Sequence, residues 1–74
     1  MQSFVVDGHD YSWGKASGTI IVWDSSEALI GTAQQDIEKF YWILEDAEGV
    51  FLARLIIDEN TDSEVAHTIA ELAE

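Results

Sequence analysis

The sequence predicts an α+β domain in which an antiparallel sheet of about four strands is covered on one face by helices, in the order ββαββα. Runs of β-branched residues mark strands in both halves of the chain. A pattern typical of a hairpin occupies residues 39–58, and an amphipathic helix follows over 62–73. With 74 residues, the chain forms one domain, 1–74, because a second domain would have no core of its own.

The first two strands are predicted on either side of a loop. Residues 3–6, "SFVV", form a short strand that ends at Asp7-Gly8. Residues 9–18, "HDYSWGKASG", are rich in turn-forming residues and predict a long loop. The run "TIIVWD", 19–24, is typical of a buried strand.

The segment 25–38, "SSEALIGTAQQDIE", has two interpretations. Ser25 or Ser26 can cap a helix, and helical spacing recurs at Leu29, Ala33, Ile37 and Phe40. Gly31 weakens such a helix by up to ~1 kcal/mol. The alternative is a hairpin that turns at Ser25-Ser26, with a strand at 27–32. We favour the helix and keep the hairpin open.

Residues 39–58, "KFYWILEDAEGVFLARLIID", predict two strands joined by a turn that Gly49 closes in the left-handed conformation. The expected register sets Leu44 opposite Phe51, Trp42 opposite Ala53 and Phe40 opposite Leu55 on a core face. The reverse face carries Tyr41, Ile43, Leu52, Arg54 and Ile56, which suggests a contact surface.

The helix predicted at 62–73 begins at a capping box formed by Thr61 and Glu64. Its apolar stripe comprises Val65, Ile69 and Leu72, with Ala66 and Ala73 beside them. The preceding stretch resembles a calcium loop, but position six is Ser63 instead of glycine and position twelve is Ile69 instead of glutamate. A calcium loop of the EF-hand type is therefore excluded, and we predict no metal site and no cofactor.

Charge is the unusual property of this chain. Fifteen Asp and Glu face three Lys and Arg, which gives a net charge of −12. A magnitude of about 2–8 suffices for solubility, so the acidity exceeds what folding needs. Repulsion makes direct binding to nucleic acid or to an anionic membrane unfavourable. The natural complement is therefore a basic partner, a cation or a high-salt environment.

The predicted topology gathers acids at two poles. One pole gathers the acids of residues 24, 45–48 and 71–74, among which the predicted site residues are Glu45, Asp46, Glu48, Glu71 and Glu74. The other pole gathers the acids of residues 36–38, 58–59 and 62–64, among which the predicted site residues are Asp58 and Glu59. Glutamates at a helix C-terminus oppose the helix dipole, and such violations of a local preference tend to mark function. Tyr11 and Trp13, in the predicted loop, are expected to be exposed contact anchors. These nine residues are the predicted partner-binding set.

Enzymatic activity is not expected. The His, Asp, Tyr and Ser of residues 9–12 are sequence neighbours, which seldom form a catalytic triad. The chain lacks cysteine, a secretory signal and an apolar stretch near the ~20 residues that cross a bilayer, so the expected location is the cytoplasm.

In size, absence of cysteine and acidity, the sequence resembles the small inhibitors of host defence encoded by phages and plasmids, such as anti-CRISPR and anti-restriction DNA mimics. This resemblance rests on composition and includes no motif. It implies a non-enzymatic inhibitor that binds a basic nucleic-acid-binding protein, most plausibly a CRISPR effector or nuclease, in the cytoplasm of the host cell.

Two other interpretations stay open. The chain could be an interaction module, such as an antitoxin, an immunity protein or an assembly subunit, which docks or forms a homodimer through the second sheet face. It could also be an ordinary domain of a halophile, acidic for solvation alone.

Overall fold

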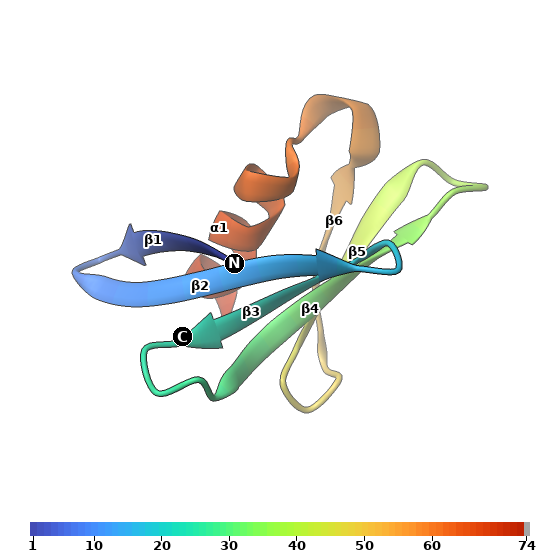
Figure 1. Ribbon diagram of the computed structural model, residues 1–74. Helices are drawn as coiled ribbons and strands as arrows, with labels where there is room; N and C mark the ends of the chain where they lie inside the picture. The colour runs from blue at the N-terminus through green and yellow to red at the C-terminus, as the bar shows by residue number, and fades with distance from the viewer. Residues whose placement is uncertain (74) are drawn as a thin grey trace.

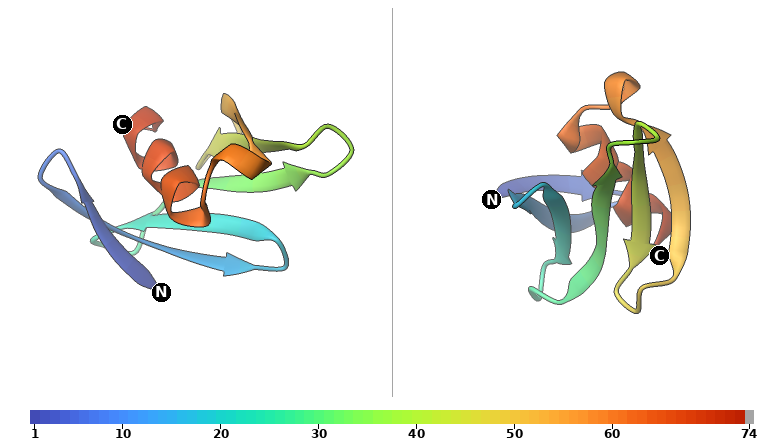
Figure 2. Two further views of the ribbon diagram at one scale, coloured as in Figure 1. Left: turned by 90° about the horizontal axis from the view of Figure 1, so that it is seen from above. Right: turned by 90° about the vertical axis from the view of Figure 1, so that its right-hand side faces the viewer.

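The computed structural model describes residues 1–73 and shows a six-stranded antiparallel sheet with one α-helix on one of its faces (Figures 1 and 2). Each strand pairs with its neighbours in the chain, so the spatial order is β1 to β6. The strands are β1 (Gln2–Val6), β2 (His9–Ala16), β3 (Thr19–Asp24), β4 (Leu29–Asp36), β5 (Tyr41–Asp46) and β6 (Phe51–Ile56). A 3-10 turn, η1 (Ile57–Glu59), leads into the helix α1 (Asp62–Leu72).

The predicted four-stranded ββαββα fold is therefore wrong. Residues 9–18, expected as a loop, contain β2, and residues 25–38, expected as a helix, contain a turn and β4. The alternative interpretation of residues 25–38, a turn followed by a strand, agrees with the structure in the type of element. Strands thus occupy both segments that were expected to be loop and helix, and only one α-helix is present in residues 1–73.

Strand β2 forms because a two-residue turn precedes it and another follows it. Asp7 and Gly8 join β1 to β2, and Ser17 and Gly18 join β2 to β3. All four residues have φ between 49° and 79°, the conformation that two-residue hairpin turns require. The aromatic Tyr11 then lies on the inner face of the sheet, only 7% exposed, and Trp13 packs against the core. The prediction that these two aromatics are exposed anchors is wrong for Tyr11, and Trp13 is half-buried.

Strand β4 carries small residues where the helix lies closest. Gly31 and Ala33 face α1, and Ala33 is fully buried. A methyl group on Gly31 would lie 2.7 Å from Cγ2 of Ile69 in α1. The apolar spacing that resembled a helix is therefore a strand whose inner positions are small because α1 packs on them.

The predicted β5–β6 hairpin is confirmed, but the predicted register of its two strands is wrong. Gly49 has φ 83°, as expected for the closing residue of the turn. Trp42 pairs with Leu55 and Leu44 with Ala53, a shift of two positions from the predicted pairs. Because side chains alternate with a period of two, this shift keeps Trp42 and Leu44 on the core face, where both are buried. Phe40 and Phe51, expected in the same core, are exposed.

The helix is confirmed together with its capping box. The Thr61 hydroxyl oxygen accepts a hydrogen bond from the Glu64 backbone N–H at 3.2 Å, and the Glu64 carboxylate accepts one from the Thr61 N–H at 3.0 Å. Hydrogen bonds to the Glu64 carboxylate, first from the Thr61 backbone N–H and then from the Thr61 side chain, lower the pKa of Glu64. The buried face comprises Val65, Ala66, Ile69 and Ala70, whereas Leu72 is largely exposed. This helix is too short and too polar to cross a bilayer, and α1 is the one α-helix of the described residues.

The core lies between α1 and the inner face of the sheet. Its largest fully buried side chains are Trp42, Ile20, Leu44, Ile69, Val22 and Val65. At the rim, Lys15 contacts Asp62 at 3.2 Å and lies 5.6 Å from the centre of the Trp42 ring, so β2 is tied to the start of α1. At the edge, the Phe4 ring of β1 lies 4.9 Å from that of His67 in α1.

Candidate functional site: the acidic end of the sheet

The strand order brings alternate turns to the same end of the sheet. The β1–β2, β3–β4 and β5–β6 turns lie at one end, and the β2–β3 and β4–β5 turns with η1 lie at the other (Figure 1). The helix starts beside η1 and runs back, so that Ala73 borders the same hollow as Asp46 and Glu48. The C-terminal part of α1 therefore lies beside the first group of turns.

Two of these turns are built in the same way around an aspartate. Oδ1 of Asp24 accepts hydrogen bonds from the N–H groups of Ser26 at 2.8 Å and Ala28 at 3.0 Å. Oδ1 of Asp46 accepts from Glu48 at 2.8 Å and Val50 at 2.9 Å. The fourth residue of each turn, Glu27 or Gly49, has a positive φ, and each hairpin has a β-bulge just beyond its turn. Both aspartates are thus fixed by the backbone that they stabilise.

The acidic end, as we name it, has carboxylates on β2, β3, β5 and α1 and in each of its three turns. Its members are Asp7, Asp10, Asp24, Glu27, Glu45, Asp46, Glu48 and Glu71. The three basic side chains lie elsewhere: Lys15 contacts Asp62, Lys39 lies in the β4–β5 turn, and Arg54 lies over the Tyr41 ring at 5.6 Å. Eight of the fourteen carboxylates in residues 1–73 therefore lie at this end without a neutralising Lys or Arg, whereas the six at the opposite end, Asp36, Glu38, Asp58, Glu59, Asp62 and Glu64, lie with Lys15 and Lys39.

The predicted site residues that the structure describes lie in three different places. The structure places Glu45, Asp46, Glu48 and Glu71 at the acidic end, and it places Asp58 and Glu59 in η1 at the opposite end. Glu74 lies outside the described residues. Tyr11 and Trp13 belong to the inner side of β2.

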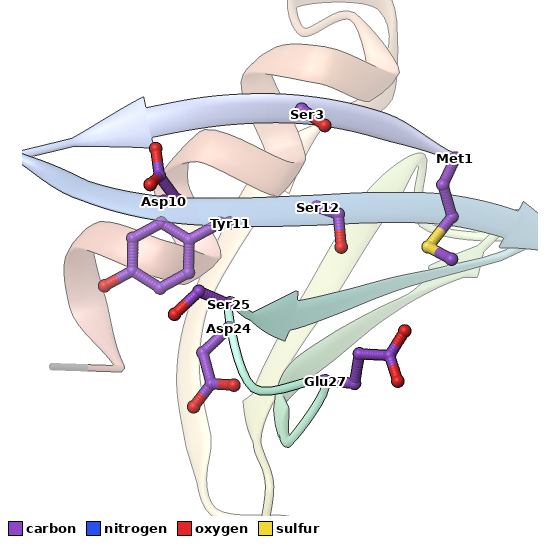
Figure 3. A pocket seen from close by; sticks show the side chains of 8 residues that line it. All are labelled: Met1, Ser3, Asp10, Tyr11, Ser12, Asp24, Ser25 and Glu27. Atoms are coloured by element: carbon purple, nitrogen blue, oxygen red, sulfur yellow. The ribbon is translucent and has the colours of Figure 1, made fainter.

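An open groove of about 410 Å³ lies at the acidic end, between β1–β2 and the β3–β4 turn (Figure 3). Its lining combines carboxylates, hydroxyls and one thioether: Asp10, Asp24, Glu27, Ser3, Tyr11, Ser12, Ser25 and Met1. Such a lining suits a guanidinium or ammonium group, which donates several hydrogen bonds and carries a positive charge. Within residues 1–73, no three His, Asp or Glu side chains are grouped closely enough to hold a metal ion.

Sequence reasoning missed this groove because it assigned both of its walls to other structures. Asp10 and Ser12 were placed in a loop, and Glu27 in a helix. The available signal was the similarity of the two turns, since Asp24 and Asp46 each end a buried strand and an aspartate at that position can accept hydrogen bonds from the turn that follows.

The sheet face away from α1 is the second candidate surface. Tyr41, Ile43, Arg54 and Ile56 lie on it, as predicted from alternation, but Leu52 packs against the core because of the bulge near Glu45. Large apolar side chains on this face are exposed at Val5, Leu29, Phe51 and Ile56. The face is thus partly apolar, and it also carries the positively charged Arg54.

No protein-family model, curated protein or solved structure matches this chain.

Proposed function

We propose that this protein is a non-enzymatic inhibitor that acts in the cytoplasm of a host cell. Its acidic end would occupy the nucleic-acid-binding surface of a basic partner, most plausibly a CRISPR effector or a nuclease. The supporting observation is the unbalanced charge of the acidic end, which carries carboxylates from three hairpin turns and the helix but no Lys or Arg. A nucleic-acid-binding surface is lined with Lys and Arg, which are the groups that such an end attracts.

The turn geometry favours this mode of binding. Asp24 and Asp46 are each held through Oδ1 by two backbone N–H groups. Immobilising a flexible side chain in an interface costs about 0.5–1.5 kcal/mol, and this cost is small for a carboxylate that is already fixed. The second oxygen of each is available to a Lys or Arg of the partner, as a phosphate oxygen would be.

The test is displacement of a fluorescent DNA duplex from purified basic proteins, including a guide-loaded CRISPR effector and a restriction endonuclease. We expect displacement that weakens by at least about tenfold between about 50 and 200 mM salt, because the contacts are between ions. Inhibition that is insensitive to salt would contradict the proposal.

A matched pair of variants tests the location. The first combines Asp24→Asn, Glu45→Gln, Asp46→Asn and Glu48→Gln; the control combines Asp36→Asn, Glu38→Gln, Asp58→Asn and Glu59→Gln at the opposite end. Asparagine retains the Oδ1 acceptor of both turns, so the first variant should keep its fold. We expect it to lose at least about tenfold in displacement, or ~1.4 kcal/mol, and the control to lose much less. Equal losses would show that net charge acts without a defined site.

The apolar sheet face supports a second candidate, an interaction module that docks or forms a homodimer through Val5, Ile43 and Phe51. Phe51 and Val5 are each 56% exposed, an unusual setting for large apolar side chains on one face. Light scattering of Phe51→Ser with Val5→Ser distinguishes the candidates. A dimer that dissociates in this variant, with DNA displacement absent in the wild type, would favour the module.

A further inference from the structure

The turn between β4 and β5 holds a bulky aromatic residue in the left-handed conformation. Phe40 has φ 59°, whereas the other non-glycine residues with positive φ are Asp7, Ser17 and Glu27. Glycine or asparagine is the usual residue in this conformation, and a bulky side chain there is an outlier. The Lys39 N–H donates to the Asp36 carbonyl oxygen at 3.2 Å, and the Ile57 N–H donates to that of Phe40 at 3.0 Å. These bonds hold the strained backbone in place.

The same turn exposes two large apolar side chains. Phe40 is 61% exposed and Ile37 is 70% exposed. The turn projects beyond the body of the sheet, at the right of Figure 1. Residues 37–40, the hairpin tip, thus combine backbone strain with exposed apolar area, and such strain clusters at functional positions.

The surroundings of the hairpin tip indicate the chemistry of its partner. Asp36 and Glu38 lie in or beside the turn, and Asp58 and Glu59 follow Ile57, which bonds to Phe40. Lys39 is the one cation within this group. A second copy of the tip would place acid against acid, and an anionic bilayer would repel it.

We infer that Ile37 and Phe40 form an anchor that enters an apolar pocket on a partner protein whose rim carries Lys and Arg. An aromatic side chain in a desolvated pocket surrounded by complementary charge is the usual composition of an interface hot spot. The hydrogen-bonded backbone fixes the direction of the Phe40 Cα–Cβ bond before binding. This anchor lies at the opposite end from the acidic groove, so it stands or falls separately from the proposed function.

Phe40→Gly separates binding from folding. Glycine suits the left-handed backbone and removes the exposed ring, so the melting temperature should stay unchanged or rise. Ser17→Gly is the matched control, because Ser17 also has a positive φ, 52°, and lies in the neighbouring turn at the same end. Ile37→Ser serves as a second variant that leaves the backbone at position 40 unchanged.

The partner chemistry is tested with a phage-displayed library of random peptides. Selection uses the wild-type protein as bait after depletion on Phe40→Gly. We expect enriched peptides that combine aromatic or aliphatic residues with Lys or Arg. In fluorescence anisotropy they should bind the wild type and Ser17→Gly alike, and bind Phe40→Gly and Ile37→Ser at least about tenfold more weakly.

Three results would overturn the inference. One is the absence of enrichment, or enrichment of peptides without basic residues. Another is a lower melting temperature for Phe40→Gly, which would give the ring a packing role. The third is flotation of the wild type, but not of Phe40→Gly, with phosphatidylcholine vesicles, which would assign the tip to a neutral membrane surface.

Discussion

Replacing Gly31 with alanine should destabilise the protein, because the helix and strand β5 leave no space for a methyl group. An alanine Cβ would lie 2.5 Å from the Glu45 carbonyl oxygen and 2.7 Å from Cγ2 of Ile69. The first neighbour is backbone in a paired strand and the second belongs to the buried face of α1, so neither can move without displacing an element.

The size of the effect follows from two opposing terms. Overpacking a well-packed core costs typically about 1–3 kcal/mol. Alanine also reduces the entropy of the unfolded chain relative to glycine, which returns about 0.4–1 kcal/mol. Because two contacts are shorter than 3.0 Å, the cost lies in the upper part of that range, about 2–3 kcal/mol. The net loss is then about 1–2.5 kcal/mol, which for a domain of this size lowers the melting temperature by roughly 4–20 °C.

The assay is thermal and urea unfolding followed by circular dichroism, with Gly14→Ala as the control. Gly14 lies on β2, and the nearest atom to its added methyl group would be 3.6 Å away, an ordinary contact with Trp23. The control should leave the free energy of unfolding unchanged or raise it by up to about 1 kcal/mol, because only the unfolded-chain term acts there. A Gly31→Ala protein as stable as Gly14→Ala would refute the close packing of α1 on β4.

Two further predictions concern the caps and turns. Thr61→Ala should cost about 1 kcal/mol in urea unfolding, because it removes the acceptor of the capping box. The Thr61 backbone N–H lowers the pKa of Glu64 from its ordinary 4.5; the stabilisation by this carboxylate is therefore complete above pH 4.5 and is lost as the pH falls through the lowered pKa. The stability difference between wild type and Glu64→Gln should accordingly shrink between about pH 7 and pH 3, and a constant difference would argue against the bond. Asp46→Ala should cost about 1–3 kcal/mol by leaving two turn amides without their acceptor, whereas Asp46→Asn should cost much less; similar losses for both would mean that the charge, and not the acceptor oxygen, stabilises the turn.

Local chemistry sufficed for the parts of the fold that depend on near neighbours. The helix was predictable because Thr61 and Glu64 satisfy its first amides, and the β5–β6 turn because Gly49 adopts a conformation that glycine favours. The faces of β5 were also predictable, since alternation alone places Trp42 and Leu44 together.

The sequence-based predictions were wrong at positions where contacts between elements distant in the sequence decide which residue type fits. The segment around Gly31 and Ala33 has apolar residues at helical spacing, but its inner positions are small because Ile69 packs above them. The hairpin register depended on the bulge beside Glu45, which the sequence does not mark. Tyr11 was expected in solvent because its polar neighbours hide the alternation that buries it.

The candidate site was predictable in part. The grouping of Glu45, Asp46, Glu48 and Glu71 follows from any arrangement in which the hairpin turn and the end of α1 lie together. The groove did not follow, because Asp10 and Glu27 come together only once residues 9–16 and 29–36 are strands. The exposed Phe40 was missed because its helical spacing suggested a core residue.

The strand order of the sheet has a kinetic consequence. Because every strand pairs with its chain neighbour, each hairpin closes over a short loop, and the sheet has a low contact order for a β-rich protein. Val65, Ala66, Ile69 and Ala70, which complete the core, belong to α1, which is synthesised after all six strands. Until α1 docks, the side chains of Ile20, Val22 and Leu44 are exposed to water. A nascent chain that has all six strands but not yet α1 is therefore the form most prone to aggregation.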